Sequence, residues 1–176
     1  MRTRRPWSDT RADPINIAVG GGMGVPEARE YLRRWNRDGD VLEFDRSSAT
    51  VELAARALGV EPGRIAKTLS FRGRERPLLV LAAGDARIDN KKFKAAFGLK
   101  ASMLSPEEAL ERTGHPVGGI CPFGLATELD VYLDESLRRF DHVFPACGSG
   151  NSALRCTLAQ LEEYSASKAW VDVCSG

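Results

Sequence analysis

One stretch of the sequence, Gly114 to Gly124, has a composition suited to ligand binding. It reads GHPVGGICPFG, and four of its eleven residues are glycine and two are proline. Glycine leaves the backbone amide groups open to an approaching molecule, and proline fixes the path of the chain beside them. A tight turn between two strands, the plainer alternative, needs only one or two such residues. We therefore predict a loop whose backbone contacts a ligand.

A single lysine, Lys67, is the second feature with chemical potential. It lies in the segment IAKTLSF, from Ile65 to Phe71. Because side chains alternate along a strand, Lys67 shares a face with Ile65, Leu69 and Phe71. An ammonium among large apolar side chains is costly unless it reaches a partner, water or an anion. A snorkelling side chain at the strand end, or a strand half exposed on both faces, would also fit. We expect a lysine in the wall of a cavity.

The helices that must position these residues carry clear start and stop signals. Three helices are each bracketed by an N-cap residue and a terminal glycine: Thr50 to Gly59, Asp89 to Gly98 and Ser105 to Gly114. Thr157 with Gln160 forms a capping box that opens a later helix, and Asp134 caps a short one. An apolar stripe from Val25 to Trp35 predicts a helix that stops at Gly39.

Apolar runs between these helices predict a series of strands. They are Val41 to Phe44, Ile65 to Phe71, Leu78 to Gly84, Leu129 to Leu133, His142 to Phe144, Ala153 to Cys156 and a closing strand around Trp170 to Val173. The strand from Leu78 is apolar at successive positions, which predicts burial on both faces.

Composition and charge limit the class of protein. The length of 176 residues suits one domain, and 25 basic against 24 acidic residues argue against a protein that coats polyanions in general. No apolar run approaches the length needed to span a membrane, and no signal peptide is evident, so we expect a cytoplasmic protein without membrane contact. The four cysteines form no C-x-x-C pair, and with two histidines they lack the spacing of a structural zinc site. Reduced thiols and no bound metal are expected.

Residues 1–22 are predicted to form an N-terminal extension, and residues 23–176 a single domain. Within the extension, INIAV followed by Gly20, Gly21, Gly22 and Gly24 looks like the entry to a dinucleotide site. A G-x-G-x-x-G pattern begun at Gly20 nevertheless meets Val25 at its last glycine, which favours a flexible linker. A dinucleotide-binding oxidoreductase would rest on these glycines alone.

The order of the segments resembles one known family. The pieces AARALGV, KTL, LLVLAAGDARIDNKKF, TGHPVGGICPFGL, VYLD and PACGSGNSALRCTLAQL, taken together, are similar to a YbaK/EbsC/ProX-type aminoacyl-tRNA editing domain. The resemblance spans roughly Met23 to Val173. It implies an α+β fold with a mixed, barrel-like β-sheet flanked by helices. It also implies hydrolysis of the ester that joins a wrong amino acid to the 3′ end of tRNA, without metal or nucleotide cofactor.

The resemblance also implies roles for particular residues. Lys67 stands where such domains carry a lysine that holds the terminal nucleotide of the tRNA, and Gly118 and Gly119 stand in the glycine loop whose backbone faces the aminoacyl carbonyl. Gly148, Ser149 and Asn151 fall in the last active-site loop. We further expect substrate contacts from Cys121, Pro122 and Phe123, and a pocket lining that includes Val41, Phe44 and Leu69. Candidates for tRNA contact are Lys91, Lys92 and Lys94, although such a basic run is usually only a solvated face.

The chain departs from the family in its last loop. Some relatives carry a His-Pro pair there, whereas this chain has Cys147 and Gly148. No Ser-His-Asp or Cys-His set is evident, so we expect attack by water, assisted by the free ribose hydroxyl of the substrate. Cys147, Cys121 and His115 could act instead, although inert residues that line a pocket are favoured.

The expected partner is a misacylated tRNA, with an aminoacyl-tRNA synthetase as a second candidate. Cysteine, alanine, proline-like and other small amino acids all remain open as the group removed. The main alternative is a module of the same fold that binds an aminoacyl or nucleotide group without turnover and regulates a partner.

Overall fold

The computed structural model of the chain describes residues 24–175. The predictions for residues 1–22, the extension and its glycine-rich alternative, lie outside these residues.

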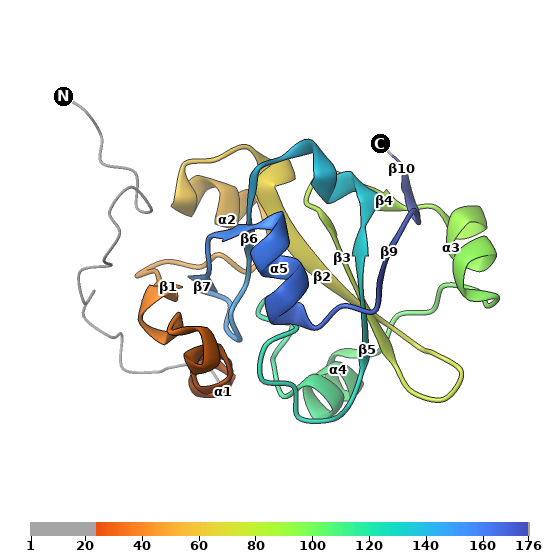
Figure 1. Cartoon of the computed structure of the whole chain (residues 1–176), viewed down its shortest axis with the longest axis horizontal. Helices are drawn as coiled ribbons and strands as arrows, with labels where there is room; N and C mark the ends of the chain where they lie inside the picture. Colours follow the sequence, from red (N-terminus) through yellow and green to blue (C-terminus); the bar gives the residue numbers. More distant parts are fainter. Residues whose placement is uncertain (1–23, 176) are drawn as a thin grey trace.

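A curled, six-stranded mixed sheet forms the centre of the fold, with strand order β8-β6-β2-β3-β5-β9 (Figure 1). In chain order its strands are β2 (Ile65–Phe71), β3 (Leu78–Ala83), β5 (Asp130–Asp134), β6 (His142–Pro145), β8 (Cys156–Thr157) and β9 (Ala169–Val171). β2 and β3 pair antiparallel, whereas β5 runs parallel to β3, and β6 runs parallel to β2. Two short antiparallel pairs join β1 (Leu42–Glu43) to β7 (Ser152–Ala153) and β4 (Arg87–Ile88) to β10 (Cys174–Ser175). The predicted α+β class with a barrel-like sheet is confirmed.

Five α-helices flank the sheet within the described residues: α1 (Val25–Leu32), α2 (Val51–Leu58), α3 (Asn90–Phe97), α4 (Pro106–Thr113) and α5 (Leu158–Ser165). The predicted N-caps of the last four are confirmed, since each side chain accepts a hydrogen bond from the first turn: Thr50, Asp89, Ser105 and Thr157. Asp134 likewise caps a short 3-10 helix, Glu135–Arg139. The predicted stop of the first helix at Gly39 is wrong, because the chain leaves its helical path at Asn36, which has a φ of 59°.

Two predicted strands are divided in the structure. Ala153 to Cys156 was expected as one strand, but β7 pairs with β1 while β8 pairs with β6. One extended segment cannot follow both partners, because they lie on different parts of the molecule. The closing segment divides in the same way, since β9 pairs with β5 and β10 pairs with β4.

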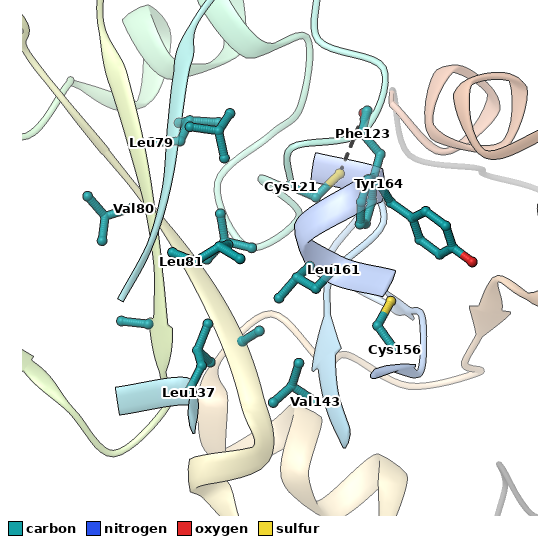
Figure 2. Packing of buried hydrophobic residues seen from close by; sticks show 14 of the residues in the cluster. Leu79, Val80, Leu81, Cys121, Phe123, Leu137, Val143, Cys156, Leu161 and Tyr164 are labelled. Carbon is teal, nitrogen blue, oxygen red and sulfur yellow. Dashed lines mark hydrogen bonds between the residues drawn. The ribbon is translucent and has the colours of Figure 1, made fainter. Parts of the chain in front are cut away.

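The main core packs the sheet against residues of α1, α3 and α5. All six residues of β3 are buried, as predicted, and Leu161 and Tyr164 of α5 pack into the same cluster (Figure 2). A second, smaller cluster joins α2 to one end of the sheet through residues that include Leu58, Ile65 and Phe144. This second cluster supports the helix whose first turn borders the candidate site described below.

Asp134 ties the end of β5 to the closing segment. Its carboxylate accepts hydrogen bonds from the backbone N–H of Ser136 and of Val173, both at 2.8 Å, and the side chain is 1% exposed. A buried carboxylate is tolerated here because two donors replace its water.

We expect Asp134→Ala to lower the free energy of unfolding by about 3 kcal/mol, because two backbone donors lose their acceptors. Asp134→Asn keeps one carbonyl oxygen as an acceptor, so its free energy of unfolding should fall by less. Urea unfolding of the wild type and the two variants measures both losses of stability. An equal loss in the two variants would contradict the explanation.

Candidate functional site

A cleft of about 460 Å³ opens along β2, between the first turn of α2 and the loops around Met103 and Gly118. β6 pairs with β2 only at Ile65 and Ala66, and the far end of β2 is closed by the loop residue Leu104, whose N–H donates to Ser70 O at 3.1 Å. The stretch of β2 between these contacts borders the cleft. The shortness of one neighbouring strand therefore makes room for a ligand.

Lys67 lines this cleft and is half-buried. Its Nζ donates to the carbonyl oxygen of Gly84 at 3.3 Å and to that of Ala86. Burial lowers the pKa of the Lys67 ammonium, while negative groups nearby, among them the Asp85 carboxylate, oppose that shift. An ammonium has three N–H donors, so two fix its position and one is left for a ligand.

Gly118 lines the same cleft from the glycine-rich loop. Its φ of +93° lies in the region that favours glycine, and an added Cβ would lie 2.9 Å from the Cβ of Ala49. Among residues 24–175, the Gly118 N–H has no hydrogen-bond acceptor. The structure thus brings Lys67 and the backbone of Gly118 to one cavity.

Gly119 faces a different way from the position predicted for it. Its N–H donates to Pro116 O and its carbonyl accepts from Gly148 N, both at 2.9 Å. A Cβ on Gly119 would lie 2.4 Å from the backbone N of Ser149. Gly119 does not line the cleft, and its backbone groups join the glycine-rich loop to the last loop instead.

The three residues predicted in the last loop also lie behind the cleft wall. Ser149 is 2% exposed, and its hydroxyl donates to Asn151 Oδ1 at 2.7 Å. The Asn151 amide in turn donates to Phe44 O at 2.9 Å, and Ser48 N donates to Gly150 O at 2.6 Å. These bonds hold the segment that leads into α2. The lining from this part of the chain comes from Ala146, Ser152 and Ala153.

The predicted substrate contacts of Cys121, Pro122 and Phe123 are not found in the cleft. Cys121 and Phe123 are fully buried in the main core (Figure 2). Pro122 borders a separate, open depression beside Tyr31 and Arg34. Sequence spacing placed them on the loop but could not show that the loop turns inward after Ile120.

Of the other residues predicted to line the pocket, Leu69 does so. Val41 belongs to the main core, and Phe44 packs against the second cluster. The predicted lysines of α3 lie elsewhere: Lys92 donates to Asp172 Oδ1 and Cys174 O, both at 3.0 Å, and Lys91 and Lys94 are exposed. α3 stands far from α1 and α2 in the molecule, and none of the three lysines borders the cleft (Figure 1).

The thiols are poorly suited to act as nucleophiles. Burial raises the pKa of Cys121 to about 12 and raises that of Cys147 well above its ordinary value. Only a thiolate attacks readily, so both groups are inert at neutral pH. Neither one lines the cleft.

His115 is a buried member of the glycine-rich loop. Its Nε2–H donates to Phe123 O at 2.7 Å, and Nδ1 has no partner within the described part of the chain. Burial lowers the pKa of the imidazole, so the neutral form is favoured in the folded protein. His115 therefore helps to shape the loop and does not reach the cleft.

Several lining residues were not singled out from the sequence. They include Ser48, Ala49, Thr68, Met103 and Val117. Val117 lies within the predicted loop, and strict alternation along β2 would put Thr68 on the face opposite Lys67. Met103 and Val117, which are 56% and 61% exposed, could have been noticed only as apolar residues in loops.

Residues 45–164 match the model of the aminoacyl-tRNA editing domain, and the chain belongs to this family. The uncharacterized protein YwhH of Bacillus subtilis is 58% identical over 153 residues, which cover 86% of this chain and 98% of YwhH. EbsC of Enterococcus faecalis, named as a candidate Cys-tRNA(Pro)/Cys-tRNA(Cys) deacylase, is 30% identical over 68% of this chain and 69% of its own length.

A solved structure supports the same assignment. A crystal structure described as a candidate trans-editing enzyme for prolyl-tRNA synthetase superimposes with a TM-score of 0.79. It is 31% identical and covers 87% of this chain and 98% of its own. Within residues 24–175, no helix is long and apolar enough to cross a membrane, and no three His, Cys, Asp or Glu side chains are grouped as a metal site.

The lowered pKa of His115 predicts a pH dependence of stability. Below the ordinary histidine pKa of 6.5, the unfolded chain binds a proton that the folded protein does not. The free energy of unfolding should therefore fall as the pH is lowered from 6.5, by at most about 1.4 kcal/mol per pH unit.

Chemical denaturation of the wild type and His115→Gln at pH 7.5 and pH 5.5 isolates this contribution. The wild type should lose more stability than the variant over this interval. Equal losses would show that His115 is not the group responsible.

Proposed function

We propose that this protein is a trans-editing hydrolase that removes a small, wrongly attached amino acid from the 3′ end of tRNA. The observation that carries the proposal is the presence of Lys67 and of the Gly118 backbone in the walls of one cleft. The family of the chain and the descriptions of its relatives support the same activity. The substrate partner is a misacylated tRNA, and a synthetase that produces it is a second partner, both met in the cytoplasm.

In this proposal, Lys67 anchors the terminal nucleotide. The carbonyls of Gly84 and Ala86 hold the ammonium in place, so little orientational freedom is lost when a phosphate or ribose oxygen binds its remaining donor. A fixed anchor places the ester at a defined point in the cleft, and such positioning can supply a large part of a rate enhancement.

The Gly118 N–H would meet the charge that develops during ester cleavage. When water attacks the ester, the carbonyl oxygen becomes negative, and a preorganised amide donor worth about 3 kcal/mol stabilises it. Gly118 is suited to this because its N–H has no acceptor among the described residues. Gly119 has no such role, because its N–H is bound to Pro116.

The proton of the attacking water needs a base, and the described lining of the cleft contains no histidine, aspartate, glutamate or cysteine. A free hydroxyl of the terminal ribose lies next to the ester in any aminoacyl-tRNA. We therefore propose that this hydroxyl orients the water and relays its proton to the neighbouring ribose oxygen, which leaves as a hydroxyl when the ester bond breaks. The protein then supplies position and electrostatic stabilisation. The substrate then contributes part of its own catalytic machinery.

Replacement of Lys67 tests the proposal most directly. Lys67→Met keeps the apolar stem but removes the charge, and a charge-assisted hydrogen bond is worth about 1.5–3 kcal/mol. We expect kcat/KM for deacylation to fall about 10- to 150-fold. Lys168→Met, the same substitution at an exposed lysine outside the cleft, should leave it unchanged.

The assay is deacylation of a panel of misacylated tRNAs that carry cysteine, alanine, serine, threonine or proline. Unchanged turnover of every substrate by Lys67→Met would overturn the mechanism. Tight binding of a substrate without turnover by the wild type would instead identify a non-catalytic binding module.

A second variant tests the backbone contact. Gly118→Ala places a methyl group 2.9 Å from Ala49 and forces alanine to a φ of +93°, so the N–H must move. We expect at least about a 10-fold loss of kcat, because small displacements of positioned groups are costly. Gly39→Ala is the matched control, since nothing lies within 4 Å of its added Cβ. Equal activity of both variants would exclude a contribution from the Gly118 loop.

A further inference from the structure

Two hydroxyl groups in the cleft wall lack hydrogen-bond partners. Ser48 is 7% exposed, and its Oγ is buried without a partner among the described residues. The Oγ1 of Thr68 is buried and unpartnered in the same way. Both residues line the cleft that contains Lys67. Buried polar groups in folded proteins are nearly always paired, so two exceptions in one cavity require an explanation.

The surroundings of these hydroxyls are mainly apolar. The lining contributed by α2, β2 and β6 includes Val51, Ala54, Ile65, Leu69 and Phe144. Lys67, the charged residue of the described lining, directs its ammonium to Gly84 and Ala86. A ligand that enters this part of the cleft meets a mainly apolar surface, with the hydroxyl groups of Ser48 and Thr68 as its polar groups.

Rotation about the Cα–Cβ bond changes the direction of either hydroxyl. Serine has three staggered positions for this torsion, so its oxygen can move without any change in the backbone. Threonine is stiffer, but it keeps more than one allowed position outside helices. The hydroxyls can therefore be satisfied by a ligand group that supplies a donor or an acceptor.

We propose that Ser48 and Thr68 are specificity-determining residues that favour an aminoacyl group with a hydroxyl in its side chain, namely serine or threonine. This inference rests on the function proposed above, because it assigns the substrate of the same cleft. A substrate hydroxyl carries one donor and two acceptor sites, so it can pair with either protein hydroxyl or with both. An apolar side chain of the same shape leaves them unpaired, and a thiol pairs only weakly.

Isosteric substrates test this selectivity. Serine and α-aminobutyrate differ by a hydroxyl in place of a methyl group, and threonine and valine form a second such pair. With each pair attached to the same tRNA, the wild type should prefer the hydroxyl member by at least about 10-fold in kcat/KM, because its apolar counterpart leaves buried polar groups unpaired.

Variants assign the preference to the two residues. Ser48→Ala and Thr68→Val should each reduce the preference at least about 3-fold, mainly by slowing the hydroxyl substrate. Ser47→Ala removes a neighbouring hydroxyl that does not line the cleft and should leave the preference unchanged. Thermal unfolding of each variant checks that the fold is retained.

Three outcomes would overturn the inference. One is a wild-type ratio near one, and a second is a ratio that neither Ser48→Ala nor Thr68→Val changes. The third is an equal slowing of both substrates of a pair, which would mean that the hydroxyls bind the α-amino group shared by all aminoacyl esters.

A binding measurement separates this inference from the proposed function. Seryl and α-aminobutyryl groups joined to 3′-amino-3′-deoxyadenosine by an amide bond resist hydrolysis, and their dissociation constants can be compared directly. If no tRNA is deacylated but the seryl compound binds more tightly, the function fails and the selectivity stands. If deacylation depends on Lys67 but the two compounds bind equally, the selectivity fails and the function stands.

Discussion

Direct packing of one backbone against another fixes the loops around the cleft. At Gly119, a side chain of any size would collide with the backbone of Ser149, and at Gly148 it would collide with that of Gly24, in each case at 2.4 Å. A hydrogen bond from the Gly148 N–H to the Gly119 carbonyl follows from the same closeness. The segment that leads into α2 is tied to this assembly by the hydrogen bond from Ser48 N to Gly150 O. Four segments, around residues 24, 48, 119 and 149, therefore share one junction, and the cleft is shaped by that junction.

The lysine in the cleft represents a balance between burial and charge. The half-buried position of Lys67 disfavours its charged form, and this lowers its pKa. Two carbonyls at the end of β3 and the nearby Asp85 favour the charged form. The carbonyls use part of its hydrogen-bonding capacity but do not neutralise it. The side chain is thus held at a defined place while its charge remains available to an anion.

The arrangement suits a reaction in which the protein contributes few reactive groups. The thiols nearest the glycine-rich loop are buried and protonated, and His115 is bound to a carbonyl within the loop. The described cleft lining includes Lys67, Gly118, Ser48 and Thr68, which carry ammonium, amide and hydroxyl groups. Such groups bind, orient and stabilise charge, whereas covalent catalysis would need an activated nucleophile beside a base.

Local signals were sufficient for most of the elements. The caps at Thr50, Asp89, Ser105 and Thr157 were predicted because each bonds to a backbone group only a few residues away. The division of the segment after Ser152 was not predicted, because it depends on which distant strands are present to pair with it.

For the site, the sequence by itself determined that Lys67 lies on a strand with apolar neighbours and that a glycine-rich loop follows the fourth helix. Only the tertiary structure decided that Gly118 shares a cleft with Lys67, that Gly119 and Ser149 form the support behind it, and that Cys121 and Phe123 belong to the core. The reason is physical: a residue's type limits what it can bind, but the direction in which a loop turns is set by contacts with segments far away in the chain.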